Sequence, residues 1–171
     1  MFFDIVFHKQ IYSDYSPAAC VQMLTNTSAT QQDIYFKMMR VAQSLTNKQC
    51  VHKAQFHDLK GPIVGPRERT CILLEETLNH FKTNSFVWHV AYCKKFEIAP
   101  ALVIFHPRKG FMNQMLKGHP VIVTKNSGDI TTIYDPSNEI PITASIKKLT
   151  PFVDTCYSLK ALDSAGNFIE L

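Results

Sequence analysis

The hydrophobic period of this chain changes near its middle, and that change limits the folds that the chain can adopt. In the first half, apolar residues recur three or four positions apart, which is typical of one face of an α-helix. The clearest such series is Ile34, Met38, Val41 and Leu45. From about residue 85 onward, short runs rich in β-branched and aromatic residues stand between turn residues, as strands do. Helices followed by antiparallel strands predict an α+β fold, with N-terminal helices packed on a C-terminal antiparallel sheet.

Three helices are expected in the first half, over residues 16–25, 31–45 and 70–81. Ser16 is expected to cap the first helix, with Pro17 at its first helical position, because both residue types favour those places. Thr30 and Thr70 are the expected N-caps of the second and third helices.

Five strands are expected after the helices, from the runs SFVWHVAY, APALVIF, HPVIVTK, DITTIYD and DTCYSLKAL. The residues NSGD, at 126–129, indicate a hairpin turn between the third and fourth runs. Three further segments carry weaker patterns. Residues 4–8 resemble a short strand, residues 47–69 resemble a mobile connector, and residues 107–118 resemble a short helix.

Composition narrows the class of protein. A chain of 171 residues is expected to form one domain over residues 1–171, and 46% hydrophobic with 19% charged residues is typical of a globular protein. The net charge of +4 is mild and the Lys and Arg residues are scattered, so no nucleic-acid partner is expected. No apolar run approaches the length of a membrane span.

The cysteine pattern also argues against several classes. Five cysteines without CxxC spacing predict neither a disulfide framework nor a zinc site, and no cofactor or metal is expected. The N-terminus lacks the basic start and cleavage site of a signal peptide. Reduced thiols and the missing signal together favour the cytoplasm, or delivery into the cytosol of a host or target cell.

Four polar residues could together form a catalytic constellation. A nucleophile needs a base, a group that orients the base, and donors for the oxyanion. His119 begins one strand run and Asp135 ends the next, 16 residues later, so antiparallel pairing brings a base beside an orienting carboxylate. Gln10 precedes Ser16 by six residues, and its amide together with the N-terminus of the helix could donate to an oxyanion.

These pieces resemble a known family. Gln10, the helix start YSPAACVQML, the run APALVIF, the run HPVIVTK and the segment IYDPSN are similar to the papain-like, double-glycine leader peptidases of bacteriocin exporters and their stand-alone relatives. The resemblance covers roughly residues 8–160, with a longer middle. It implies a papain-like cysteine peptidase fold, a peptide or protein substrate, and a site formed by Gln10, the helix start, His119 and Asp135.

The chain departs from this family at the nucleophile. Aligned as DYSPAAC on the family's DCGPAAL, Tyr15 replaces the cysteine, as in the degenerate domains of haemolysin-type exporters that bind substrate without cleaving it. Aligned as SPAACVQM on CWAASVQM, Ser16 replaces it. The six-residue spacing from Gln10, Met23 seven residues later and the two alanines favour Ser16. A serine there is also what an inactivating Cys-to-Ser substitution leaves.

Two functions are therefore expected from the sequence. The first is a cysteine-peptidase-like hydrolase of a peptide, isopeptide or side-chain amide bond, with Ser16 at the nucleophile position. The alternative is a catalytically inactive peptidase-like domain that binds a partner protein or a secretion substrate. Cys20 lies one helical turn beyond Ser16, on the apolar stripe with Met23, and is expected to be a core residue. Phe86 and Trp88 are likewise expected in the core.

Overall fold

Among the residues that the structure describes, three helices precede a single sheet. The computed structural model describes residues 5–45, 67–93, 100–105 and 119–169. The helices are α1 (Ser16–Thr25), α2 (Gln31–Leu45) and α4 (Arg67–Phe81). The strands are β1 (Val87–Cys93), β2 (Ala101–Phe105), β3 (Pro120–Ser127), β4 (Ile130–Tyr134), β5 (Ile142–Ser145), β6 (Val153–Leu162) and β7 (Phe168–Ile169). A short helix, α5 (Ile146–Leu149), and a 3₁₀ turn (Thr150–Phe152) connect β5 to β6.

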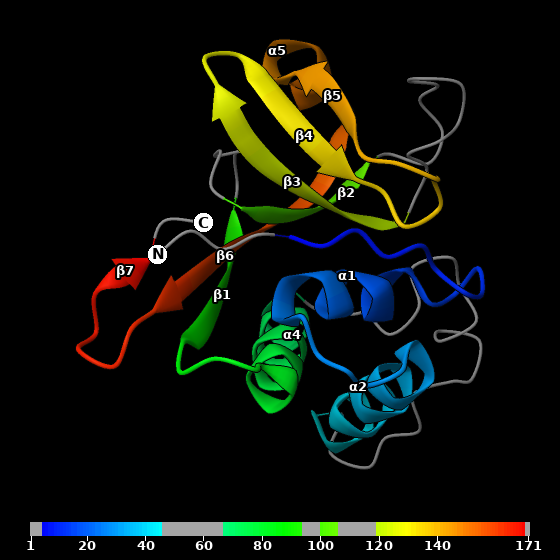
Figure 1. Ribbon diagram of the computed structural model, residues 1–171, viewed down its shortest axis with the longest axis vertical. Helices are drawn as coiled ribbons and strands as arrows, with labels where there is room; N and C mark the ends of the chain where they lie inside the picture. The colour runs from blue at the N-terminus through cyan, green and yellow to red at the C-terminus, as the bar shows by residue number, and fades with distance from the viewer. Residues whose placement is uncertain (1–4, 46–66, 94–99, 106–118, 170–171) are drawn as a thin grey trace.

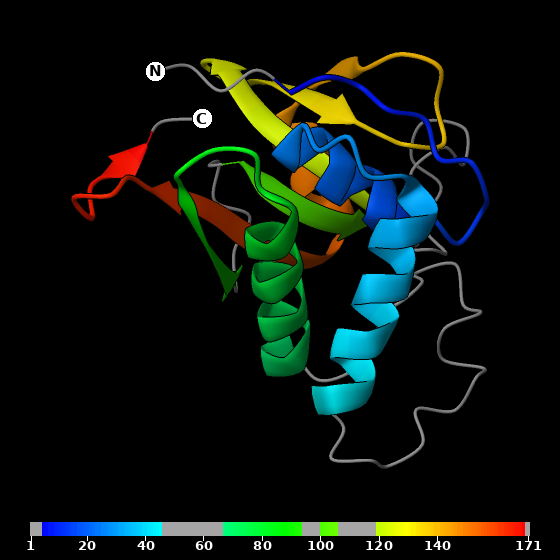
Figure 2. The same cartoon turned by 60° about the horizontal axis from the view of Figure 1, so that its bottom comes forward.

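The sheet is antiparallel throughout, but its order differs from the chain order. The strands lie in the order β1-β6-β2-β3-β4-β5, and β7 pairs with β6. The late strand β6 therefore lies between two early strands, with Ala91 opposite Ser158 on one side and Ala101 opposite the same Ser158 on the other. Figures 1 and 2 show α1, α2 and α4 gathered on one side of this sheet. The predicted α+β fold is confirmed.

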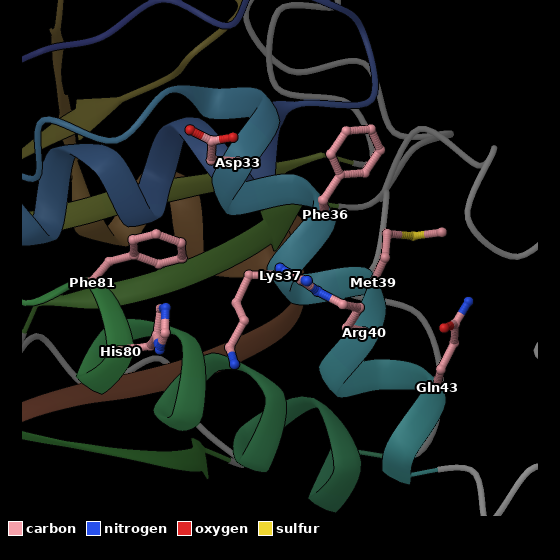
Figure 3. A pocket seen from close by; sticks show the side chains of 8 residues that line it. All are labelled: Asp33, Phe36, Lys37, Met39, Arg40, Gln43, His80 and Phe81. Atoms are coloured by element: carbon pink, nitrogen blue, oxygen red, sulfur yellow. The ribbon is translucent and has the colours of Figure 1, made fainter.

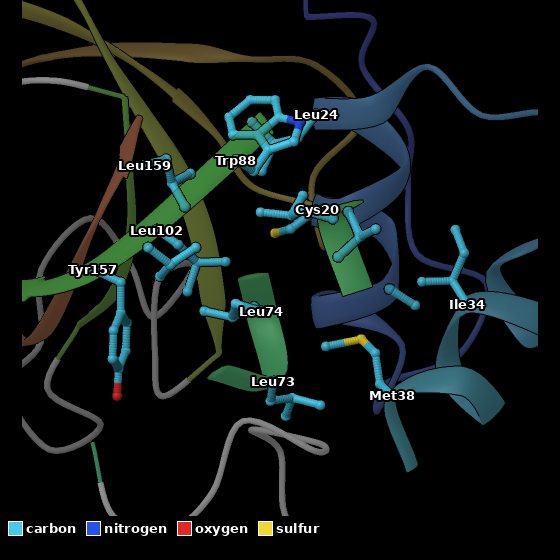
Figure 4. Close-up of a cluster of buried hydrophobic side chains, with 14 of the residues drawn as sticks. Cys20, Leu24, Ile34, Met38, Leu73, Leu74, Trp88, Leu102, Tyr157 and Leu159 are labelled. Atoms are coloured by element: carbon cyan, nitrogen blue, oxygen red, sulfur yellow. The ribbon is translucent and has the colours of Figure 1, made fainter. Parts of the chain in front are cut away.

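The core has two parts because β2 is buried on both faces. Side chains of a strand alternate between faces, so Leu102 and Ile104 contact the helices while Val103 and Phe105 pack on the opposite face, together with Leu149 of α5. Figure 4 shows the larger cluster, in which Cys20 and Leu24 of α1 lie across from sheet residues such as Trp88 and Leu159. The predicted core positions of Cys20, Phe86 and Trp88 are confirmed.

Most predicted elements are observed. The five expected strand runs correspond to β1, β2, β3, β4 and β6, and helices 16–25 and 31–45 are found with these bounds. Thr30 caps α2, since its hydroxyl accepts a hydrogen bond from the backbone N–H of Asp33 at 3.1 Å. The sequence patterns missed β5, α5 and β7, which are short and carry few residues with a clear period.

Several boundary predictions were wrong. Tyr15, not Ser16, is the N-cap residue of α1, and it makes no side-chain cap bond. The hydroxyl of Ser16 is instead bonded to Gln10, outside the helix. The third helix begins at Arg67, so Thr70 lies inside α4 and is not its N-cap. Residues 5–8 form no strand. Most of the predicted connector (its residues 47–66) and all of the predicted helix at 107–118 lie outside the described residues.

Candidate active site

The hairpin of β3 and β4 brings His119 beside Asp135. Ile122 of β3 pairs with Tyr134 of β4, so the residue just before β3 and the residue just after β4 meet at the same end of the hairpin. Nε2 of His119 lies 2.6 Å from Oδ1 of Asp135. His119 is largely buried and Asp135 is fully buried. The proximity expected from the sequence is therefore present, with the carboxylate held on one side of the imidazole.

Asp135 is itself held by the turn that follows it. Its Oδ1 accepts hydrogen bonds from the backbone N–H of Ser137 at 2.9 Å and from the Ser137 hydroxyl at 2.7 Å. An aspartate that bonds the backbone two residues on is an Asx turn. Its other oxygen, Oδ2, is buried without a hydrogen-bond partner among the described residues. Ser137 was missed by the sequence reasoning, although the segment DPSN is a recognisable turn signal.

Ser16 and Gln10 form the other half of the site. The Ser16 hydroxyl donates a hydrogen bond to Oε1 of Gln10, across the loop that separates the two residues. Ser16 is fully buried at the start of α1, where the helix presents backbone N–H groups that have no partner within the helix. The positive end of the helix dipole lies at the same place.

Two contacts connect these halves. The backbone N–H of Gln10 donates to the carbonyl of Pro136 at 2.8 Å, directly after Asp135. The thiol of Cys20 donates to the carbonyl of Pro120 at 3.5 Å, directly after His119. Helix α1 and the loop that precedes it therefore bond to both strands at the open end of the hairpin, next to the imidazole and the carboxylate.

Cys20 is a buried thiol whose surroundings do not favour a nucleophile. Burial raises the pKa of the Cys20 thiol well above its usual range, and the negative charge of Asp135 raises it further. A thiol whose pKa is raised stays protonated and is a poor nucleophile. The environment of Cys20 therefore favours a packing role.

Tyr15 packs among aromatic rings beside Ser16. Its ring stacks on Tyr35 of α2, with centroids 4.7 Å apart and an interplanar angle of 22°, and it meets the edge of Tyr12 at 5.0 Å. Burial raises the pKa of Tyr35, and the negative charge of Asp14 and its hydrogen bond with Tyr35 raise it further, to about 12. Tyr15 thus faces the helices as part of the larger core cluster.

A separate hollow lies between α2 and α4. Its volume is about 630 Å³. Figure 3 shows the side chains that line it: Asp33, Phe36, Lys37, Met39, Arg40, Gln43, His80 and Phe81. None of the four candidate catalytic residues is among them. Within the described residues no group of three His, Cys, Asp or Glu side chains could hold a metal ion, and no helix is long and apolar enough to cross a membrane.

Comparison with known proteins shows a likeness of structure alone. No protein-family model and no curated protein sequence matches this chain. Among solved structures, the chain is similar to a double glycine motif protease from an AMS/PCAT transporter, solved in complex with the leader peptide. The TM-score is 0.55 with 9% sequence identity, and the match covers 91% of this chain and 90% of that chain.

This likeness defines the class of fold. The chain has a papain-like peptidase fold, with helices on one side of an antiparallel sheet, as the resemblance in sequence implied. The match to the double-glycine motif protease extends along nearly the whole length of both chains. At 9% identity the match concerns the fold, so the roles of Gln10, Ser16, His119 and Asp135 stay a prediction.

Proposed function

We propose that this protein is a papain-like hydrolase of a peptide, isopeptide or side-chain amide bond, with position 16 as its nucleophile position. The observation that carries the proposal is the junction between the two halves of the site. The Ser16–Gln10 pair is attached, through the Gln10 N–H and the Pro136 carbonyl, to the turn that follows Asp135, and Asp135 in turn pairs with His119. Two pairs of residues that lie far apart in the sequence are thus linked by hydrogen bonds, and their residue types are those that acyl transfer needs.

The proposed roles follow from the hydrogen bonds. Asp135 accepts the Nε2 proton of His119, which orients the ring and leaves the base function to Nδ1. His119 takes the proton of the Ser16 hydroxyl as Oγ bonds to the substrate carbonyl carbon. The tetrahedral intermediate then breaks its C–N bond, and the leaving amine receives the proton from His119. Water hydrolyses the acyl-enzyme by the reverse sequence and regenerates the hydroxyl.

Gln10 and the helix start are the proposed oxyanion donors. In the resting arrangement the Gln10 amide oxygen accepts the Ser16 proton. A rotation of the amide by about half a turn exchanges its oxygen and its NH₂ group, because the two occupy equivalent positions on the same planar group. The NH₂ can then donate to the oxyanion together with a backbone N–H at the start of α1.

A second function is supported by the surroundings of Ser16 and Tyr15. Ser16 is fully buried and its hydroxyl is engaged with Gln10, and Tyr15 is packed against Tyr35. This arrangement also fits a domain that binds a peptide or a partner protein without cleaving it. The similar solved protease is bound to a leader peptide, which supports a peptide as the ligand under either function.

Ser16→Cys tests the proposal, because cysteine is the nucleophile that the resemblance leads us to expect there. We expect the new thiol to react with iodoacetamide at pH 6, where an unperturbed thiol is protonated, and the variant to hydrolyse peptide bonds. Removal of the base by His119→Ala in the Ser16→Cys chain should slow both reactions, by about 10²-fold or more. Labelling is assigned to position 16 by peptide mass mapping.

Ser13→Cys is the matched control, since Ser13 is exposed in the same loop and lies away from the hydrogen bonds of the site. Its thiol should react with the rate of an ordinary exposed cysteine. A Ser16→Cys thiol that reacts no faster than the Ser13→Cys thiol at pH 6, in a chain without hydrolytic activity, would overturn the hydrolase proposal and favour the binding domain.

A further inference from the structure

We propose that Gln31 is a positioning residue for Gln10: its buried amide holds the backbone on both sides of Gln10 so that the Gln10 side chain faces Ser16. The inference deepens the proposed function and rests on it for its catalytic consequence. It starts from Gln31 alone, which is a polar side chain at the first position of α2 with only 3% of its surface exposed.

The amide of Gln31 bonds to the two residues that flank Gln10. Its Oε1 accepts the backbone N–H of Ile11 at 2.9 Å, and its Nε2 donates to the backbone carbonyl of Lys9 at 2.8 Å. The Gln31 amide thus supplies one donor and one acceptor to this backbone, as the main chain of a neighbouring β-strand would. The side chain of Gln31 thus replaces a strand partner at this point in the chain.

A second glutamine supports the first. Nε2 of Gln31 also lies 3.1 Å from Oε1 of Gln22 on α1, and Nε2 of Gln22 donates to the carbonyl of Ala29 at 3.2 Å. Both polar atoms of Gln31 are therefore engaged. A buried amide with satisfied donors and acceptors has one preferred orientation, because any other would leave a polar group unpaired.

Residues 9–11 are consequently held from two sides. Gln31 bonds the backbone of Lys9 and Ile11 from α2, and the carbonyl of Pro136 accepts the N–H of Gln10 from the hairpin. The segment from residue 5 to Gln10 has no regular secondary structure, so no ladder of backbone bonds positions it. Gln10 lies where these restraints meet, and its side chain is bonded to Ser16.

This arrangement predicts an effect on turnover rather than on substrate binding. The Gln10 amide contributes most when the oxyanion forms, so a small displacement of its backbone weakens transition-state stabilisation more than ground-state binding. Gln31 bonds to the two residues that flank Gln10, so it acts through Gln10. Loss of its amide should therefore lower kcat and leave KM nearly unchanged.

The test uses the full chain with Ser16→Cys, into which Gln31→Met is introduced. Methionine is similar in size to glutamine and removes all three hydrogen bonds of the amide. We expect kcat to fall about tenfold while KM changes less than about twofold, since misplacement of a catalytic group costs rate. The Ile11 amide, followed by NMR hydrogen exchange, should exchange about tenfold faster because its acceptor is lost. The thermal midpoint of each variant, measured alongside, shows that it is folded.

Two further variants sharpen the result. Gln31→Glu keeps an acceptor for Ile11 and loses the donor to Lys9 and Gln22, so its Ile11 exchange should lie between that of the parent and that of Gln31→Met. Gln32→Met is the matched control, because Gln32 is the same residue type at the next position of α2 but is exposed. Neither kcat nor Ile11 exchange should change in that control.

Separate outcomes overturn the two proposals. Unchanged Ile11 exchange in a folded Gln31→Met variant would overturn the backbone contact, and faster exchange with unchanged kcat would overturn the positioning role. If Ser16→Cys shows no hydrolysis, the proposed function fails. In that case the NMR chemical shift of the Gln10 side-chain amide still tests whether Gln31 positions Gln10. An unchanged shift in the Gln31→Met variant would overturn the inference.

Discussion

At the residue scale, Ser16 and Cys20 lie one turn apart on α1 in different surroundings. Ser16 faces Gln10, while Cys20 packs in the core and donates to the Pro120 carbonyl. Both are fully buried, so burial alone does not separate the proposed nucleophile position from a packing position. The hydrogen-bond partners separate them: a side-chain amide from a neighbouring loop for Ser16, and a single backbone carbonyl for Cys20.

Cys20 should not react in the folded protein. Because burial and the charge of Asp135 raise the pKa of its thiol, we expect iodoacetamide at pH 7 to modify Cys20 only after unfolding in urea. The partly exposed Cys71 and Cys93 are internal references that should react in the native chain. Cys20→Ala in the Ser16→Cys chain should keep the reactivity of position 16. Native labelling of Cys20 as fast as Cys93 would contradict this.

At the element scale, the β3–β4 hairpin positions the imidazole and the carboxylate. The paired strands set which residues meet at its open end, where Nε2 of His119 and Oδ1 of Asp135 lie 2.6 Å apart. At its closed end Gly128 has φ +56°, a conformation in which other residues are strained. The turn thus determines the register that brings the two site residues together.

Gly128→Ala should destabilise the protein through its backbone alone. A Cβ at Gly128 would have no atom within 4 Å, so the cost is the strain of a left-handed residue, about 1 kcal/mol. Gly128→Asn should cost less, because asparagine adopts this conformation more readily. The free energy of unfolding in urea measures both. Equal losses for alanine and asparagine would show that strain at this position is not the cause.

At the scale of the whole molecule, the sheet holds the two parts of the core together. β2 lies between β6 and β3 and is buried on both faces, with the helices on one side and α5 on the other. The start of α1 and the end of the hairpin can meet only because this central strand fixes the two layers relative to each other.

Leu102→Ala should therefore lower the free energy of unfolding by about 2–5 kcal/mol, the usual cost of removing a fully buried leucine side chain. Ile130→Ala is the control, because Ile130 is 44% exposed on β4 and its loss should cost about 0.5 kcal/mol. Urea unfolding followed by tryptophan fluorescence measures both variants, with Trp88 as the probe. Similar losses in the two variants would contradict this account of the core.

The sequence by itself determined the helices, the strands and the contacts that depend on residues close together in the chain. Periodic apolar residues predicted α1 and α2 with their bounds, and alternating runs predicted five of the strands. The NSGD turn predicted that His119 and Asp135 meet, because a hairpin links residues close in the chain. The spacing of six positions between Gln10 and Ser16 likewise favoured placing the two residues in one site, where they form a hydrogen bond.

Only the tertiary structure decided what depends on residues distant in the chain. No short stretch of sequence predicts that β6 lies between β1 and β2. The same is true of the hydrogen bond from Gln10 to Pro136 and of the bonds from Gln31 to Lys9 and Ile11. From the sequence, Gln31 is predicted only as a residue of a helix, and its contacts form only when α2 packs beside the loop that holds Gln10. The physical reason is that such partners are selected by burial and hydrogen-bond satisfaction in the assembled core, which no short window of sequence contains.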